Sequence, residues 1–415
     1  MQRVISNQAA NRVARKPLWT RSYVLLCLSM GLAYVHEGLL VPTIPLYVQS
    51  LTGSAAIVGL VLGLFSLLGF TIRPFLGQLA DRANPRFVFV LGTLCLSVCD
   101  VAFLVPVFGL ICLVSAVRGA GWAGVNTGGN TILAYLAPAK RRAEGATYYS
   151  LFQGTAMALT PIAALWIIKS SGGSVYWPVF LAAAGCGVAA ALLSQAILAH
   201  LLRPKGSPSA PARPERRDRW SLLYDRGVVL PAGLLALMNL TFPAATSFMP
   251  LYFERSGIDL GMLSWYYVAR AAGVVITQSF LARTFDRIGR GRATALGLGL
   301  SIAGLGFLLA PGSVVLLTLG GIATAVGQSI GIVNTTAMAI DRSNPQRLGS
   351  AMASFTLAFQ VGQGAGAALA GGLIQAAGYR AMFLTMIGSQ VVCLALLAAR
   401  WSTPATQPQP TMDAS

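Results

Sequence analysis

Apolar runs long enough to cross a membrane recur along the whole chain of 415 residues. A transmembrane helix needs about 20 mostly apolar residues to cross a hydrocarbon core of roughly 30 Å. We identify twelve such runs, at 22–48, 54–78, 87–106, 108–136, 145–168, 176–201, 228–252, 260–282, 293–311, 313–339, 350–375 and 380–400. Charged residues make up only 10% of the chain. The sequence therefore predicts an all-α integral membrane protein with twelve transmembrane helices.

The distribution of basic residues predicts the orientation of the chain and explains its net charge of +18. Most of the 30 Lys and Arg residues fall on the termini and loops of one face. The loops of the other face hold three basic residues, Lys169, Arg255 and Arg380. An excess of Lys and Arg marks the cytoplasmic side of a membrane protein. We therefore expect a multi-pass protein of the cytoplasmic (inner) membrane with both termini in the cytoplasm, and no nucleic-acid partner.

The longest polar interruption, 202–227, divides the apolar runs into six and six. It is rich in Pro, Ser and Arg, which is typical of a solvated linker. The predicted parts are a cytoplasmic tail (1–21), a six-helix bundle (22–201), a cytoplasmic linker (202–227), a second six-helix bundle (228–400) and a disordered tail (401–415). Repetition supports two related halves, because the string VNT at 125–127 recurs at 333–335.

Two charged turns carry a resemblance to a known family. The string GQLADRANPR (77–86) follows the second run, and FDRIGRGR (285–292) follows the eighth. With Arg118, Gly121 and Gly124 in the fourth run, these turns make residues 20–400 resemble the major facilitator superfamily, nearest its drug:proton antiporter, or efflux, branch. The resemblance implies two pseudo-symmetric six-helix bundles. It also implies a gating role for the residues of the turns, namely Gly77, Asp81, Arg82, Arg86, Asp286, Arg287 and Arg290.

Two acidic residues, Glu37 and Asp100, fall inside predicted spans. A charge at the bilayer centre costs about 2.5–3.5 kcal/mol on insertion scales, so such residues usually face a cavity or a partner. Glu37 and Arg118 each lie about ten residues, or about 15 Å, from the outer ends of their spans, so we expect them to pair. Separation from Arg118 would let Glu37 take up a proton. A permanent structural tether is the alternative.

Asp100 is the other residue that we assign to proton coupling. It lies nearer the outer end of its span, where it either receives protons from outside or satisfies a hydroxyl group near the rim. His36 adjoins Glu37 but points about 100° away around a helix, which turns once in 3.6 residues. It either relays protons or packs in its neutral form against a neighbouring helix.

Arg270 lies near the midplane of the eighth span, at a depth similar to that of Arg118. One arginine from each half would create a positive site between the bundles, where transporter substrates bind. We predict Arg118, Arg270, Trp122 and Tyr267 as substrate-binding residues. The alternatives are a structural role at helix-end carbonyls for Arg270 and packing for the aromatic residues. One glutamate against two arginines favours an anionic or zwitterionic substrate over a lipophilic cation.

These features predict a transporter. The sequence holds no metal-ligand cluster, no Ser-His-Asp constellation and no phosphate-binding loop, so we expect no enzymatic activity, metal, cofactor or direct use of ATP. We expect a monomer whose partners are protons, a small-molecule substrate and the lipid bilayer. Proton-coupled export of a drug-like or acidic, siderophore-like molecule by alternating access is the first interpretation. Proton-coupled uptake is the alternative, and a non-transporting receptor or scaffold is the remote one.

Overall fold

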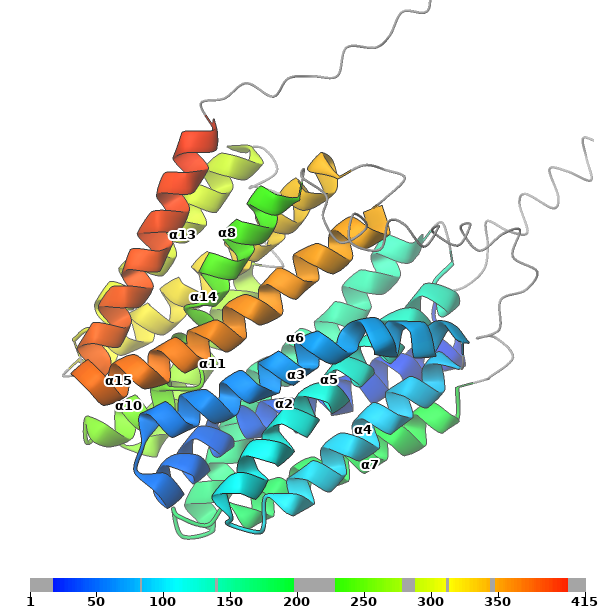
Figure 1. The fold of residues 1–415 in the computed structure, drawn as a ribbon, viewed down its shortest axis with the longest axis horizontal. Coiled ribbons are helices and arrows are strands. Elements are labelled where there is room, and N and C mark those ends of the chain that lie inside the picture. Colours follow the sequence, from blue (N-terminus) through cyan, green and yellow to red (C-terminus); the bar gives the residue numbers. More distant parts are fainter. Residues whose placement is uncertain are drawn as a thin grey trace, which may run out of the picture.

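The computed structural model describes residues 18–82, 84–138, 141–197, 228–277, 288–310, 313–343 and 348–401. All regular structure within these ranges is helical (Figure 1). The helices are α2 (Arg21–Thr52), α3 (Ala55–Arg82), α4 (Pro85–Ala102), α5 (Phe108–Leu136), α6 (Arg142–Ser170), α7 (Trp177–Gln195), α8 (Val229–Asn239), α9 (Phe242–Ala245), α10 (Met249–Arg255), α11 (Leu260–Ile276), α13 (Arg290–Phe307), α14 (Val314–Arg342) and α15 (Leu348–Trp401).

The first helices begin and end at residues that suit helix termini. The Thr20 side chain accepts a hydrogen bond from the backbone N–H of Tyr23 and so caps the start of α2. Gly53 ends α2 in the left-handed region, with φ of 65°. Asn84 caps α4, and Pro85 takes the first helical position, where its missing N–H has no partner to lose.

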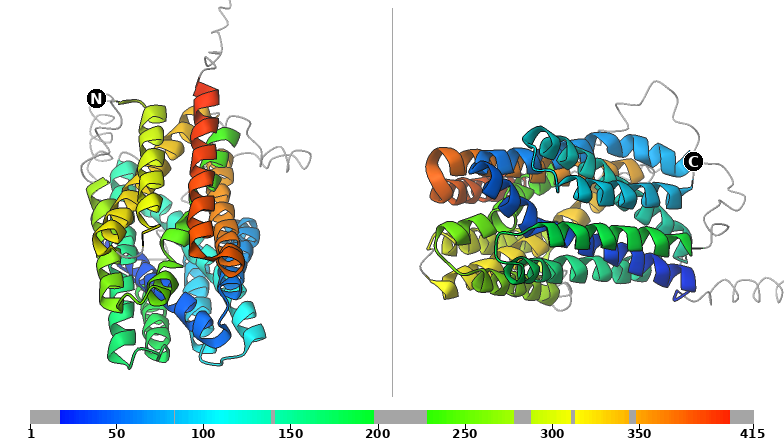
Figure 2. Two further views of the ribbon diagram at one scale, coloured as in Figure 1. Left: turned by 90° about the vertical axis from the view of Figure 1, so that its left-hand side faces the viewer. Right: turned by 90° about the horizontal axis from the view of Figure 1, so that it is seen from below.

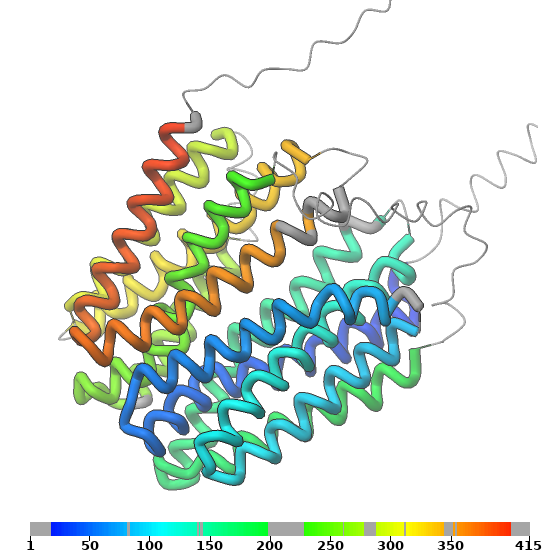
Figure 3. Tube along the Cα trace, viewed as in Figure 1, coloured from blue at the N-terminus to red at the C-terminus, as the bar shows by residue number. Residues whose placement is uncertain are grey.

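The helices account for all twelve predicted spans. Nine segments in the described ranges are long and apolar enough to cross a membrane, among them Val229–Arg255 and Phe355–Ala399. The second of these holds two spans, because α15 turns back at Gly378, where φ is 81° (Figure 3). The remaining two spans are α11, of 17 residues, and α13, of 18 residues. The all-α membrane fold predicted from the sequence is confirmed.

The seventh predicted span is broken into α8, α9 and α10. A proline has no N–H to donate, and its ring clashes with the carbonyl four residues earlier. The first break follows Asn239, four residues before Pro243, and the second includes Thr246, four residues before Pro250. The sequence pattern did not predict these breaks, because the segment reads as one uncharged run of transmembrane length.

The helices form two groups, α2–α7 and α8–α15, which can be followed in each view (Figures 1 and 2). They meet at the end that carries the short connections 53–54, 103–107, 171–176 and 256–259, here called the short-loop end. There α3 and α15 are so close that a Cβ added at Gly59 would lie 2.5 Å from the Ala367 carbonyl oxygen. Away from this end, α3 and the first limb of α15 diverge (Figure 1).

Polar contacts also join the two groups at the short-loop end. The Ser54 hydroxyl donates a hydrogen bond to the Gln375 side chain at 3.2 Å. Lys169 and Asp259 form an exposed ion pair at 3.5 Å. By the distribution of basic residues, this end is the predicted outer face.

Candidate functional site

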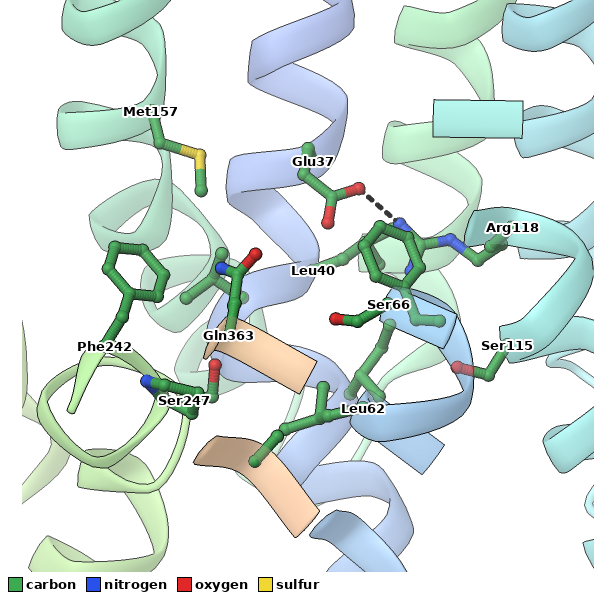
Figure 4. A pocket seen from close by; sticks show the side chains of 15 residues that line it. Glu37, Leu40, Leu62, Ser66, Ser115, Arg118, Met157, Phe242, Ser247 and Gln363 are labelled. Carbon is green, nitrogen blue, oxygen red and sulfur yellow. Dashed lines mark hydrogen bonds and ion pairs between the residues drawn. The ribbon is translucent and has the colours of Figure 1, made fainter. Parts of the chain in front are cut away.

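Two adjoining cavities lie between the helix groups, in the membrane-spanning part of the protein. The first, here called the charged cavity, is lined by Glu37, Leu40, Val41, Ile44, Leu62, Phe65, Ser66, Ser115, Arg118, Met157, Phe242, Pro243, Ser247, Gln363 and Ala367 (Figure 4). The second, here called the arginine cavity, is lined by Val41, Gly154, Met157, Ala158, Pro161, Phe242, Thr246, Tyr267, Arg270, Ala271 and Val274. Their volumes are about 70 and 180 Å³. They share Val41, Met157 and Phe242, so both helix groups contribute to each cavity and to the wall between them.

A chain of four ionisable side chains runs from the charged cavity into the amino-terminal bundle. An Arg118 Nη2 group donates a hydrogen bond to Glu37 Oε2 at 2.6 Å (Figure 4). Behind it, Arg118 Nε lies 3.3 Å from Asp100 Oδ1, an ion pair without the alignment of a hydrogen bond. Asp100 Oδ2 lies 2.5 Å from His36 Nε2. The chain links α2, α5 and α4, and it returns to α2 at its end.

Burial increases along this chain. The Glu37 side chain is 14% exposed, Arg118 is 2% exposed, and both Asp100 and His36 are fully buried. The Arg118 guanidinium also lies 5.3 Å from the centroid of the Phe65 ring on α3. Glu37 is therefore the carboxylate in contact with the cavity, whereas Asp100 contacts only the interior of the bundle.

The structure brings Glu37 and Arg118 together, as their similar depths predicted, but it changes the interpretation of Asp100 and His36. Asp100 does not satisfy a hydroxyl group near the rim, because it is fully buried against Arg118 and His36. His36 does not simply pack against a helix, because it bonds Asp100. The count of one glutamate against two arginines is therefore wrong, since two carboxylates flank Arg118. The sequence feature that pointed to this arrangement is Asp100 itself, a second acidic residue inside an apolar span.

Arg270 faces the arginine cavity from α11 and is 8% exposed. It donates hydrogen bonds to two neutral side chains of α14, to Thr324 Oγ1 at 2.8 Å and to Gln328 Oε1 at 3.3 Å. Within the described ranges, no carboxylate forms an ion pair with it. Arg270 thus places a full positive charge, without a counter-ion from the described residues, beside a mostly apolar cavity.

The broken seventh span forms the wall of both cavities through Phe242. Backbone carbonyls freed by the breaks need donors, because water is scarce at this depth. The hydroxyl groups of Tyr266 and Tyr267 donate to the carbonyls of Ala245 and Thr246, each at 2.8 Å. The aromatic run of α11 therefore stabilises the irregular backbone, and Tyr267 also lines the arginine cavity.

Other predicted site residues have different surroundings. Trp122 packs against Tyr34, with ring centroids 4.8 Å apart. The Arg86 guanidinium donates to the carbonyls of Gln195 and Ile197 and so binds the end of α7 within its own bundle.

The remaining gating residues divide between described and undescribed parts. Arg290 forms an ion pair with Asp341 at the ends of α13 and α14. A Cβ on Gly77 would meet no atom within 4 Å. Asp286, Arg287 and the side chains of Asp81 and Arg82 lie outside the described residues.

Comparison with known proteins identifies related sequences. The family model described as Major Facilitator Superfamily matches residues 26–269 and 256–414. The quinolone resistance protein NorA of Staphylococcus aureus is 28% identical over 138 residues, which cover 33% of this chain and 36% of that relative. The matched segment thus spans little more than a third of that relative. The uncharacterized MFS-type transporter YddS of Bacillus subtilis is 22% identical over 434 residues, 96% of this chain and 98% of that relative.

Solved structures share the fold. A mutant of the nucleoside transporter NupG superimposes with a TM-score of 0.73 at 15% identity, over 91% of this chain and 99% of that one. A bacterial homolog of the human lysosomal transporter Spinster, in an inward-facing and unoccupied conformation, gives a TM-score of 0.68 at 17% identity. That match covers 93% of this chain and 96% of the other. At these identities the likeness shows a common fold and nothing finer.

Proposed function

The chain belongs to the major facilitator superfamily, and we propose that this transporter exports small organic molecules in exchange for protons by alternating access. The observation that carries the proposal is the pairing of Glu37 with Arg118 at the wall of a cavity between the two helix groups. A partly buried carboxylate in contact with a cavity can exchange a proton with whichever side of the membrane the cavity faces.

The proton step follows from the strength of the Glu37–Arg118 contact. While Arg118 donates to Glu37 at 2.6 Å, the ionised carboxylate is favoured. If helices α2 and α5 move apart during the cycle, Glu37 loses this donor in a mostly apolar environment, where the protonated form is favoured. Proton uptake and release at Glu37 would thus follow the conformational change.

The arginine cavity supports a substrate that carries a carboxylate or another acidic group beside an apolar body. Arg270 supplies the charge, while Val41, Met157 and Phe242 supply the apolar surface. Acidic metabolites, siderophore-like chelators and drug-like acids all share this chemistry. Arg118 contributes less than the sequence suggested, because Glu37 and Asp100 already flank it.

The contacts at the short-loop end support an alternating cycle in which this end is closed. Ser54 with Gln375 and Lys169 with Asp259 would have to separate when the cavities open to the outer face. The same proposal assigns both termini and the linker 202–227 to the cytoplasm, in a monomer of the cytoplasmic membrane. Its support is the excess of basic residues on that face.

The test is transport by the purified chain in proteoliposomes, with a quinolone carboxylic acid as the first probe. Quinolones are chosen because a similar protein is named for resistance to them and because they carry a carboxylate. Vesicles with an acidic lumen should accumulate the probe by antiport, beyond the level in protein-free vesicles. Accumulation in vesicles with an alkaline lumen would instead indicate symport, and hence uptake.

The coupling residue is tested by Glu37→Gln, which keeps the side-chain shape but cannot release a proton. We expect this variant to bind the probe but to lose its response to the pH gradient. Glu254→Gln is the matched control, because Glu254 lines a separate polar cavity at the short-loop end. A Glu37→Gln variant that still responds fully to the gradient would make Glu37 a tether and shift the coupling role to Asp100.

A further inference from the structure

We propose that Asp100, positioned by His36, is the permanent counter-ion of Arg118, and that this pairing leaves Glu37 free to exchange its proton. The inference deepens the proposed function and rests on its assignment of Glu37 as the coupling carboxylate. Of the two membrane-embedded carboxylates, Asp100 keeps its negative charge, whereas Glu37 gains and loses a proton.

Burial and position distinguish the two carboxylates. Asp100 is fully buried, and its Oδ1 lies 3.3 Å from Arg118 Nε, on the side of the guanidinium away from the cavity. Glu37 is 14% exposed and contacts the cavity-facing Nη2. A proton from the cavity therefore reaches Glu37 without any rearrangement, whereas Asp100 is shielded from it by Arg118 and His36.

The hydrogen bonding of His36 indicates which proton it carries. Its Nε2 lies 2.5 Å from Asp100 Oδ2, and its buried Nδ1 has no partner. An imidazolium would bury an unsatisfied N–H at Nδ1, which is costly. The neutral tautomer with the hydrogen on Nε2 donates to Asp100 and leaves only an acceptor unpaired. His36 therefore stabilises the ionised form of Asp100 without adding a positive charge.

The resulting charge count explains why Glu37 is the variable group. Arg118 carries one positive charge, while ionised Asp100 and Glu37 carry one negative charge each. With Glu37 ionised the cluster has a net negative charge, and with Glu37 protonated it is neutral. Burial of net charge is unfavourable at low dielectric. Asp100 thus offsets the attraction by which Arg118 alone would hold Glu37 ionised.

The surrounding helices add little charge. Helix α7 has no ionisable charged residue in Trp177–Gln195 and meets α4 through the Ser97 hydroxyl, which donates to the Ala184 carbonyl. On α4 itself, Cys95 and Cys99 are the titratable neighbours of Asp100. On α2, Tyr34 lies one turn before Glu37 and donates to Asn126 on α5.

The helices that face the cavity side of Glu37 contribute neutral residues. These are Phe65 and Ser66 from α3, Met157 from α6, Phe242 and Ser247 from the seventh span, and Gln363 from α15. On α3, Arg73 is a further cation, which interacts electrostatically with Tyr34, one turn before Glu37. Among the described residues, Arg118 is the charged group that contacts Glu37 directly, and Asp100 contacts Arg118 in turn.

The experiment is an infrared titration of the purified protein, which reads the carboxylic C=O band of protonated Glu37 directly. The band is assigned by its loss in Glu37→Gln. In Asp100→Asn, Glu37 is the one carboxylate partner that the described residues leave to Arg118, so protonation of Glu37 should require more acid. We expect the pH midpoint of the band to fall by about one unit or more. This is the lower end of the shift that a nearby opposite charge produces in the titration of a carboxyl group. Glu144→Gln, at the partly exposed pair with Arg141, is the matched control and should leave the midpoint unchanged.

His36 is tested by two substitutions in the same assay. His36→Leu removes the donor to Asp100, so it should lower the midpoint as Asp100→Asn does. His36→Gln places an amide N–H near the former Nε2 and should restore the midpoint toward that of the wild type. A purely structural histidine would give two variants with equal midpoints.

The outcomes separate this inference from the proposed function. An unchanged midpoint in folded Asp100→Asn, or a shift toward higher pH, would overturn the inference even if the protein transports. A lower midpoint in a protein that moves no solute would support the inference and refute the proposed function. If Asp100→Asn fails to fold, the comparison of His36→Leu with His36→Gln decides the question.

Discussion

Arg270 offers the sharpest test of substrate chemistry, because its charge has no carboxylate partner among the described residues. We expect Arg270→Gln to weaken binding of a carboxylate-bearing ligand far more than binding of the matching carboxamide. The substitution removes the charge but keeps an amide donor near Thr324 and Gln328, the present partners of Arg270. The polar wall of the cavity is thus kept, and charge is the main change.

The expected magnitude follows from one charge-assisted hydrogen bond. Such a bond contributes about 1.5–3 kcal/mol. Since about 1.4 kcal/mol corresponds to a tenfold change in affinity, the acid should lose roughly 10- to 150-fold. The amide makes only a neutral contact, worth about 0.5–1.5 kcal/mol, and should lose roughly tenfold or less. Arg270→Lys should restore part of the affinity, because it keeps the charge and loses the two-pronged geometry.

The assay is equilibrium binding of a quinolone carboxylic acid and its carboxamide to the purified protein. Arg255→Gln is the matched control, because Arg255 lines a different cavity, at the short-loop end, and should affect neither ligand. Equal losses for acid and amide in Arg270→Gln would refute the reasoning. Arg270 would then be a structural partner of α14, and uncharged or cationic drugs would become the better substrate class.

Three further predictions concern the transport cycle and topology. A Cβ added at Gly371 would lie 2.4 Å from the Ala55 carbonyl oxygen, so Gly371→Leu should prevent closure of the short-loop end and increase thiol labelling of a Gln375→Cys reporter; unchanged labelling would contradict the close contact. Cysteines at Lys140 and Lys169 should label from opposite sides of the membrane, and labelling from one side would overturn the predicted orientation. Phe242→Ala should preserve binding of the acid probe but lower the number of protons moved per substrate, as measured by paired pH-dye and substrate fluxes. An unchanged ratio would argue against Phe242 as a coupling element.

The fold was predictable because long apolar runs have few alternatives in a membrane. The structure places the ends of α2 at residues that suit helix termini, Thr20 and Gly53, although the apolar run alone gave 22–48. The breaks in the seventh span were harder to predict, because Pro243 and Pro250 lie in one uncharged run of transmembrane length. Proline is tolerated within other spans, since α2 continues through Pro42 and Pro45. Only tertiary partners such as Tyr266 and Tyr267 decide where the backbone opens.

The candidate site was predictable only in part. Depth along a helix was sufficient to pair Glu37 with Arg118, since both positions follow from a constant rise per residue. Depth was misleading for Asp100, whose Cα lies nearer the short-loop end while its carboxylate contacts Arg118. Helix rotation and tilt, which set such contacts, depend on packing and cannot be read from one sequence. The pairing of Asp100 with His36 could not be foreseen for the same reason.

Phe242 can link the two cavities, because it lines both of them and belongs to the broken seventh span. It lies on α9, a single turn bounded by both breaks, and it lines the charged cavity and the arginine cavity alike. A short helix with irregular backbone on either side can shift with less disruption than a continuous one. A substrate held at Arg270 would press on Phe242 and change how much water reaches Glu37 on the other side of the shared wall. Because the protonated form of Glu37 is favoured when its surroundings dry, occupancy of one cavity would change proton binding in the other. Coupling would then need no direct contact between the proton and the substrate, which is why Phe242→Ala should alter the ratio of the two fluxes rather than the binding of either.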